Sequence, residues 1–153
     1  MKFAFNKMKR EDAHQIASWH YEAPYDFYDV DQDPGDLAEL LNPQSWEESY
    51  YSVFNDENEL VGLFVFKPES QTVEVGLGLR PDLTGKGLGR SFLNAGLTFG
   101  QEHFTVGTWS LSVATFNTRA IHLYEHVGFT PINTFMHHTN GGEFEFLRMV
   151  RPM

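Results

Sequence analysis

Three glycines at alternate positions, Gly85, Gly87 and Gly89, mark the stretch LRPDLTGKGLGR. Glycines at this spacing present successive backbone N–H groups with no Cβ in the way. A helical pattern follows them, and the positive end of a helix together with the charges of Lys86 and Arg90 favours an anion. The stretch therefore predicts a site for a phosphate group. A tight strand-to-helix turn that simply needs glycines is the alternative.

Two well-known phosphate loops do not fit these residues. A Walker loop has a glycine, four residues and then Gly-Lys-Ser/Thr, whereas Gly85-Lys86 is followed by Gly87 and lacks the upstream glycine. A dinucleotide fingerprint reads G-x-G-x-x-G in the first of two βαβ halves, but this loop reads G-x-G-x-G and lies in the middle of the chain. Neither class of nucleotide-binding protein is therefore expected.

A second segment, LSVATFNTRAIHLYEHVGF, gives the loop its context. Together the two stretches resemble the GCN5-related N-acetyltransferase (GNAT) superfamily. The acetyl-CoA loop of that family reads Gln or Arg, two residues, Gly, one residue, Gly or Ala, and TGKGLG matches it with Thr84 in the Gln/Arg place. The family's later pattern of Asn, Ala, Leu-Tyr and Gly-Phe is met at the same spacing by Asn117, Ala120, Leu123, Tyr124, Gly128 and Phe129.

The resemblance implies acetyl-CoA as the cofactor. In such enzymes the strand before the loop diverges from its neighbour, and its freed backbone groups bind the pantetheine arm. Because Thr84 is shorter than Gln or Arg, backbone amides are expected to carry more of the pyrophosphate binding. Asn117 is expected both as a helix N-cap and as a contact of the cofactor arm. The implied cofactor residues are Leu77, Gly78, Leu79, Thr84, Gly85, Lys86, Gly87, Leu88, Gly89, Arg90, Asn117 and Ala120.

Two residues are candidates for proton transfer, Tyr124 and Glu74. Attack of an amine on a thioester expels a thiolate, and a nearby phenol can protonate it. Members of the family use this tyrosine as that acid, although a half-buried core tyrosine is the alternative. The acceptor ammonium, with a reference pKa of about 10.4 for a lysine-like amine, must first lose a proton. Glu74 can take it directly or through water, or it is simply a solvent-facing strand residue.

The acceptor is expected against the stretch WHYEAPYDFYDVDQD, because GNAT acceptors lie near the first helices and the loop between them. Aromatic faces beside carboxylates suit a cationic amine through cation–π contact and charge steering. The alternative is that the aromatics pack the loop onto the core while the acids stay solvated. Aminoglycosides, polyamines, other small amines and a peptide N-terminus all remain open. The candidate acceptor residues are Trp19, Tyr21, Tyr25, Phe27 and Tyr28.

No metal is expected at these sites. His122 and His126 stand four residues apart but lack a third ligand.

Ser112 stands where family members that acetylate ribosomal-protein N-termini carry a glutamate, which weakens the likeness to that group.

Composition narrows the function classes further. The 153 residues suit one domain, residues 1–153, and the absence of cysteine excludes disulfides and a cysteine nucleophile. The net charge of -10 argues against nucleic-acid binding. Of the 21 acidic residues 14 lie between Glu11 and Glu59, which indicates a cationic ligand or a solvated acidic surface. With no signal peptide or long apolar run, a cytoplasmic protein without a membrane partner is expected.

Hydrophobic periodicity predicts the elements that must position these residues. The predicted class is α/β with α+β character, a single domain with a mixed sheet flanked by helices. The resemblance implies that this sheet is mostly antiparallel, with diverging strands at the acetyl-CoA cleft. The helix near the end is expected to stop at a left-handed Gly128. Strands are expected at residues 2–8, 49–55, 60–68, 72–80, 108–114, 131–138 and 143–150, and helices at 11–20, 36–41, 87–103 and 117–127.

These observations predict an acetyltransferase. It would move an acetyl group from acetyl-CoA to a primary amine, by direct attack in a ternary complex. A catalytically idle CoA-binding or regulatory domain is the alternative. Homodimers are common in the family, so a second copy of the chain is a candidate partner.

Overall fold

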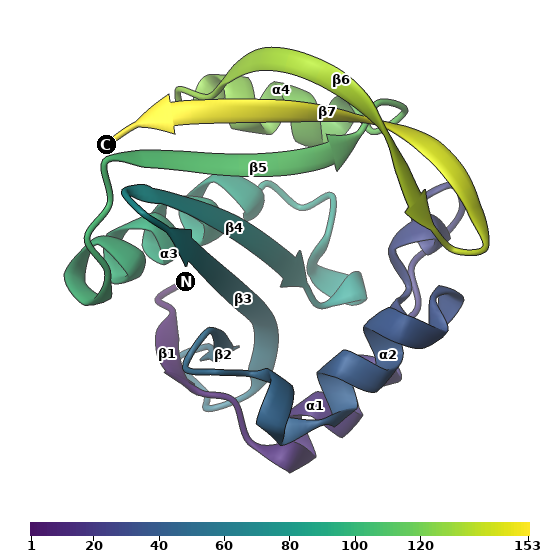
Figure 1. Cartoon of the computed structure of the whole chain (residues 1–153). Helices are drawn as coiled ribbons and strands as arrows, with labels where there is room; N and C mark the ends of the chain where they lie inside the picture. The colour runs from purple at the N-terminus through teal and green to yellow at the C-terminus, as the bar shows by residue number, and fades with distance from the viewer. The chain divides into compact units, whose positions relative to one another are not determined.

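The computed structural model describes all 153 residues and contains seven strands and four α-helices (Figure 1). The strands are β1 Ala4–Lys7, β2 Tyr50–Phe54, β3 Leu60–Glu69, β4 Thr72–Leu79, β5 Thr108–Ala114, β6 Thr130–Thr139 and β7 Gly142–Pro152. The helices are α1 Arg10–Ala17, α2 Pro34–Leu41, α3 Gly89–His103 and α4 Thr118–His126. The strands form one sheet in the order β1-β2-β3-β4-β5-β7-β6. No helix combines the length and the apolar character needed to cross a bilayer.

The chain divides into two compact units, and β3 and β4 contribute residues to both. The first unit comprises Met1–Val65 and Leu77–Leu88, and the second comprises Phe66–Gly76 and Gly89–Met153. The prediction of a single domain over residues 1–153 stays a prediction.

The first unit joins β1, β2 and the start of β3 as antiparallel strands. Asp12 in the first turn of α1 accepts the N–H of Lys9, the residue before the helix, at 3.1 Å. Asp33 begins α2 by accepting the N–H groups of Gly35 and Asp36. The two helices pack against each other (Figure 1). Their apolar faces enclose a core that consists of Met8, Ala13, Ile16, Trp19, Leu40, Tyr50 and Leu60.

The second unit is built on β5, which pairs antiparallel with β7 along its length. A long hairpin joins β6 to β7 (Figure 1). On its other side β5 pairs in parallel with β4, but only from Thr72 to Glu74, although both strands continue. The predicted divergence of β4 from its neighbour is therefore confirmed within this unit. The prediction of a mixed, mostly antiparallel sheet is also confirmed.

Every predicted strand and helix is present; the strand ends differ by one or two residues, and the larger differences lie at helix ends. The first helix ends at Ala17, so the prediction that it continues to His20 is wrong. The helix predicted from Gly87 begins at Gly89, because Gly87 has a φ of 78°, which an α-helix does not allow. The predicted caps of α4 are confirmed: Asn117 accepts the N–H of Ala120 at 3.1 Å, and Gly128 has a φ of 103°.

Candidate functional site

The glycine loop, residues 84–88, follows β4 in the first unit. Gly85 and Gly87 have φ angles of 71° and 78°, in the left-handed region that favours glycine. Thr84 and Gly85 form a hydrogen-bonded turn, and Gly85, Lys86 and Gly87 are all exposed. Exposed backbone amides around left-handed residues can form a concave anion site. The loop is therefore chemically suited to a phosphate group.

The third glycine of the motif has a different reason. Gly89 begins α3 in the second unit, and a Cβ on it would lie 3.0 Å from Cδ2 of Leu123 on α4. Its lack of a side chain allows close packing of the two helices. Two of the three glycines are thus required by backbone conformation and one by packing.

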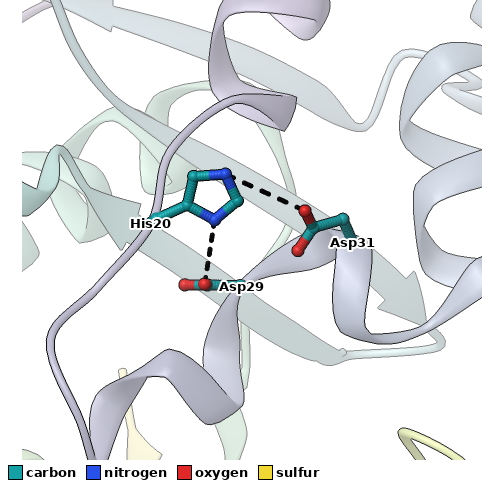
Figure 2. Close-up of side chains that lie close together, drawn as sticks. All are labelled: His20, Asp29 and Asp31. Carbon is teal, nitrogen blue, oxygen red and sulfur yellow. Dashed lines mark hydrogen bonds and ion pairs between the residues drawn. The ribbon is translucent and has the colours of Figure 1, made fainter.

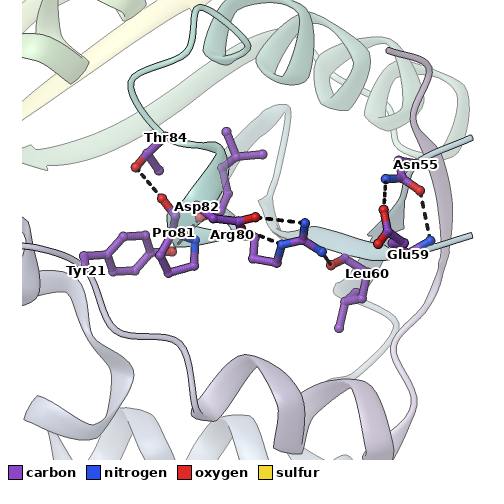
Figure 3. A network of polar contacts seen from close by, with 9 residues as sticks. Tyr21, Asn55, Glu59, Leu60, Arg80, Pro81, Asp82 and Thr84 are labelled. Carbon is purple, nitrogen blue, oxygen red and sulfur yellow. Dashed lines mark hydrogen bonds and ion pairs between the residues drawn. The ribbon is translucent and has the colours of Figure 1, made fainter. Parts of the chain in front are cut away.

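The positive charge near the glycine loop is smaller than its sequence suggests. The Arg80 guanidinium bonds both carboxylate oxygens of Asp82, at 2.6 and 3.1 Å, and donates to the carbonyl of Leu60 at 3.1 Å (Figure 3). The same ion pair lowers the pKa of the Asp82 carboxyl. Arg80 therefore stabilises the turn, and exposed Lys86 is the cation of the loop itself. The spacing Arg-Pro-Asp was the available signal for this pair.

The turn before the glycine loop also engages Thr84. Its hydroxyl donates to the carbonyl of Pro81 at 2.7 Å (Figure 3). The side chain that stands in the Gln/Arg place of the family motif thus closes the short 3-10 turn Pro81–Leu83.

The end of β4, Leu77 to Leu79, is held from two directions. The N–H of Arg80 donates to the carbonyl of Val61 on β3 at 2.7 Å. The carbonyl of Leu79 accepts the Tyr21 hydroxyl at 2.8 Å. Gly78 allows a close approach here, because a Cβ would lie 2.8 Å from Cδ2 of Leu63.

The acceptor loop, residues 20–33, holds four of the five candidate acceptor aromatics. Trp19, which precedes it, is only 8% exposed and belongs to the core of the first unit. Tyr21 is half-buried, and this burial raises the pKa of its phenol to about 12. Trp19 is thus a core residue, and the Tyr21 hydroxyl is used in a hydrogen bond to the carbonyl of Leu79.

The remaining aromatics of this loop lie on one turn of 3-10 helix, Tyr25–Tyr28. The rings of Phe27 and Tyr28 meet edge to face with centroids 5.3 Å apart. Tyr28 is 37% exposed, while Tyr25 and Phe27 are half-buried. This turn presents aromatic surface next to exposed Asp26.

A cluster of His20, Asp29 and Asp31 orders the acceptor loop (Figure 2). His20 Nδ1 lies 3.0 Å from Asp29 Oδ2, and its Nε2 lies 3.9 Å from Asp31 Oδ2. The hydrogen bond with Asp29 raises the pKa of His20. Each imidazole nitrogen faces a different carboxylate. A single metal ion would instead be coordinated by only one nitrogen of this ring. The arrangement places one imidazole ring between two carboxylates, which favours its protonated form.

Asp29 is the buried member of this cluster, with a side chain 6% exposed. Its second oxygen accepts the N–H of Tyr21 at 2.8 Å. No spacing rule predicts the contact of His20 with Asp29, since nine residues separate them and the loop has no period.

The second unit holds the other candidate residues. Asn117 is buried and uses its side-chain oxygen for the cap of α4, at the N–H of Ala120. Tyr124 on α4 is half-buried, with its ring edge to face against Phe129 at 6.1 Å. Glu74 is half-buried on β4 opposite Ser110. Arg90 is exposed in the first turn of α3. Their catalytic and binding roles stay predictions.

His122 and His126 follow the spacing of a metal pair on α4. However, Nδ1 of His126 lies 2.7 Å from the carbonyl oxygen of His122. The His126 ring is thus used by the backbone of its own helix.

Comparison with known proteins places these features in a family context. The model of the Acetyltransferase (GNAT) family matches residues 11–129. The chain is 29% identical over 119 residues to spermidine N(1)-acetyltransferase of Vibrio cholerae, which covers 74% of this chain and 65% of that protein. It is 41% identical over 58 residues to mycothiol acetyltransferase of Propionibacterium freudenreichii, 38% of this chain and 18% of that protein. The chain therefore matches less than two thirds of the length of either relative.

The fold also matches solved structures. The crystal structure of spermidine N-acetyltransferase from Vibrio cholerae, in complex with CoA and spermine, aligns with a TM-score of 0.78 and 20% identity. The match covers 98% of this chain and 95% of that chain. At this identity the likeness concerns the fold.

Proposed function

Because the chain belongs to the acetyltransferase (GNAT) family, we propose that it moves an acetyl group from acetyl-CoA to a primary amine of a cationic small molecule. The single observation that carries the proposal is the glycine loop, whose exposed backbone amides at left-handed glycines suit a phosphate group. They lie in the stretch that matches the family's acetyl-CoA loop. A turn needed for chain direction alone would leave this match unexplained.

Acetyl-CoA supplies the acetyl thioester, and the chain offers three kinds of group to hold it. The amides of Gly85, Lys86 and Gly87 would bind the pyrophosphate, with exposed Lys86 and Arg90 adding charge. The backbone edge of Leu77 to Leu79 would bind the pantetheine arm. Thr84 bonds Pro81, which supports a binding mode based on backbone amides.

Tyr124 and Glu74 are the proposed proton-transfer groups. Glu74 takes a proton from the ammonium, directly or through water, and the neutral amine attacks the thioester carbonyl. The new C–N bond forms as the C–S bond breaks, and the proton lost by the amine nitrogen passes to solvent. Tyr124 donates its proton to the departing thiolate and regains one from solvent. A positioned acid or base contributes about 10²–10⁴-fold in rate.

A polyamine is the acceptor class that we favour. Two observations support it: a relative and a structural neighbour are both described as spermidine acetyltransferases, and the acceptor loop combines aromatic rings with carboxylates. Tyr25, Phe27 and Tyr28 would contact the methylene and ammonium groups, with Asp26 nearby. Trp19 is left out of this set because it belongs to the core.

An amine panel tests this proposal directly. The full chain is incubated with acetyl-CoA and spermidine, spermine, an aminoglycoside or an N-terminal peptide, while release of free thiol is followed. We expect turnover with a polyamine above the rate of hydrolysis without acceptor. Turnover only with another class would overturn the acceptor assignment. Binding of acetyl-CoA with no turnover on any amine would instead favour an idle CoA-binding domain.

A further inference from the structure

Tyr21 links the acceptor loop to the end of β4 within the first unit. Its backbone N–H donates to Oδ1 of Asp29 at 2.8 Å. Its hydroxyl donates to the carbonyl of Leu79, 58 residues further along the chain, also at 2.8 Å. Figure 3 shows the ring reaching the turn that begins at Arg80 and Pro81. One residue is thus fixed at its backbone by the loop and at its tip by the strand.

The direction of the Leu79 carbonyl decides what this link can do. The N–H of Arg80 points to β3, where it donates to Val61. In a trans peptide the carbonyl of Leu79 points the opposite way, away from β3. Backbone groups alternate along a strand, so those of Leu77 share the direction of Leu79. The Tyr21 hydroxyl therefore lies on the β4 edge proposed above for the pantetheine arm.

The packing around Tyr21 makes this contact specific. A Cβ on Gly78 would lie 3.8 Å from the Tyr21 hydroxyl oxygen and 2.8 Å from Cδ2 of Leu63. A side chain at residue 78 would therefore disturb the face on which Tyr21 and Leu63 meet the strand. Burial raises the pKa of Tyr21 to about 12, so the hydroxyl stays a donor at neutral pH.

We infer that Tyr21 is a positioning residue for the acyl transfer: its hydroxyl fixes the Leu77–Leu79 edge of β4, and buried Asp29 fixes Tyr21. This inference rests on the proposed function, because the edge matters to the reaction only if it binds the acyl donor. The link also joins the loop proposed for the acceptor to the strand proposed for the donor. A ligand that orders the acceptor loop should therefore favour binding of the acyl donor at β4, and the reverse should also hold.

The test compares two tyrosine variants that each lose one hydroxyl hydrogen bond. Tyr21→Phe removes the bond to Leu79, whereas Tyr50→Phe removes a 2.6 Å bond to Glu39 in the same unit that does not involve β4. The first readout is hydrogen–deuterium exchange of a peptide covering residues 77–80. We expect faster exchange in Tyr21→Phe and no change in Tyr50→Phe.

The second readout is the affinity for acetyl-CoA, measured by isothermal titration. Loss of one net hydrogen bond at the binding edge corresponds to a dissociation constant about fivefold higher in Tyr21→Phe. Tyr50→Phe should bind like the wild type, and its kcat at saturating acetyl-CoA should be unchanged. A merely structural tyrosine would not separate the two variants in this way.

A double-mutant cycle tests the role of Asp29. If Asp29→Asn acts through Tyr21, the double variant with Tyr21→Phe should bind acetyl-CoA no more weakly than the weaker single variant. Additive losses would contradict a single link.

The outcomes separate the two claims. If the wild type binds acetyl-CoA but Tyr21→Phe matches it in affinity and exchange, the positioning role is wrong and the proposed function stands. Equal weakening in Tyr21→Phe and Tyr50→Phe would also overturn the positioning role. If the wild type does not bind acetyl-CoA, the proposed function falls and the inference falls with it.

Discussion

The glycine loop and the acceptor loop present polar groups in opposite ways. The glycine loop presents the exposed backbone of Gly85, Lys86 and Gly87. The acceptor loop uses much of its polarity internally, since Asp29 engages both His20 and the backbone of Tyr21. A backbone-built site can be recognised from a glycine pattern. In a loop that is held by side-chain contacts, the surface left for a ligand can be identified only from the structure.

The largest expected effect is on kcat, in a variant that alters the proposed chemistry and leaves ligand binding at both loops unchanged. Tyr124→Phe removes the proposed acid while keeping the ring that packs on Phe129. We expect kcat to fall about 100-fold. The affinities for acetyl-CoA and for the amine should stay unchanged, because neither loop is altered. Steady-state kinetics with titration of both ligands would check this, and an unchanged kcat would remove Tyr124 from the mechanism.

The next effect concerns the glycine loop alone. Gly87→Ala places a Cβ at a φ of 78°, where the space around it is open but the backbone is strained. The loop should relax, misalign its amides and bind acetyl-CoA about tenfold more weakly.

Gly141→Ala is the matched control for this change. Gly141 has a φ of 75° with equally open space, in the turn between β6 and β7. Both variants should lose about 1 kcal/mol of unfolding free energy. Only Gly87→Ala should lose acetyl-CoA affinity, and equal affinities would mean that the glycine loop is only a turn.

A smaller effect is expected at the acceptor loop. Tyr28→Ala removes an aromatic ring that is 37% exposed. The KM for a polyamine should rise about threefold through a lost cation–π contact, while the KM for acetyl-CoA stays unchanged. Phe144→Ala on β7 removes a ring with 40% exposure and serves as the control. If both variants have the same KM for the amine, the loop aromatics do not contact the acceptor.

The smallest effect is a pH dependence of stability from His20. Asp29 raises the pKa of His20, so the protonated imidazole stabilises the folded loop. This contribution is fully present below the ordinary histidine pKa of about 6.5, and it is lost as the pH rises through the raised folded pKa. Chemical denaturation of the wild type should show a drop in unfolding free energy over this range that His20→Gln lacks. Parallel pH profiles would show that the cluster does not stabilise the loop.

The sequence predicted local features well because each depends on neighbouring residues. Periodicity located every strand and helix, and the capping rule predicted Asn117 as the N-cap of α4, where it accepts the N–H of Ala120. The glycine pattern identified the exposed loop with left-handed glycines. Diverging strands followed from the family likeness, and the pairing of β4 with β5 ends at Glu74 although both strands continue.

The features that were missed depend on contacts between distant residues or on burial. Tyr21 meets Leu79 across 58 residues, which no spacing rule reveals. Trp19 looked like an acceptor contact beside other aromatics, but it closes the core. Arg80 adds a formal positive charge beside the glycine loop in the sequence, but its guanidinium bonds Asp82 and the carbonyl of Leu60. In each case the residue type showed which contacts the side chain could make, and only the fold showed which partner it has.

The most direct test of the central claim is isothermal titration of the wild-type chain with acetyl-CoA and with S-acetylpantetheine, which lacks the pyrophosphate. If the glycine loop binds the pyrophosphate, acetyl-CoA should bind saturably and much more tightly than the shorter thioester. In Gly87→Ala the difference in affinity between acetyl-CoA and S-acetylpantetheine should be smaller. Equal affinity for the two thioesters, or no binding of acetyl-CoA, would contradict the account.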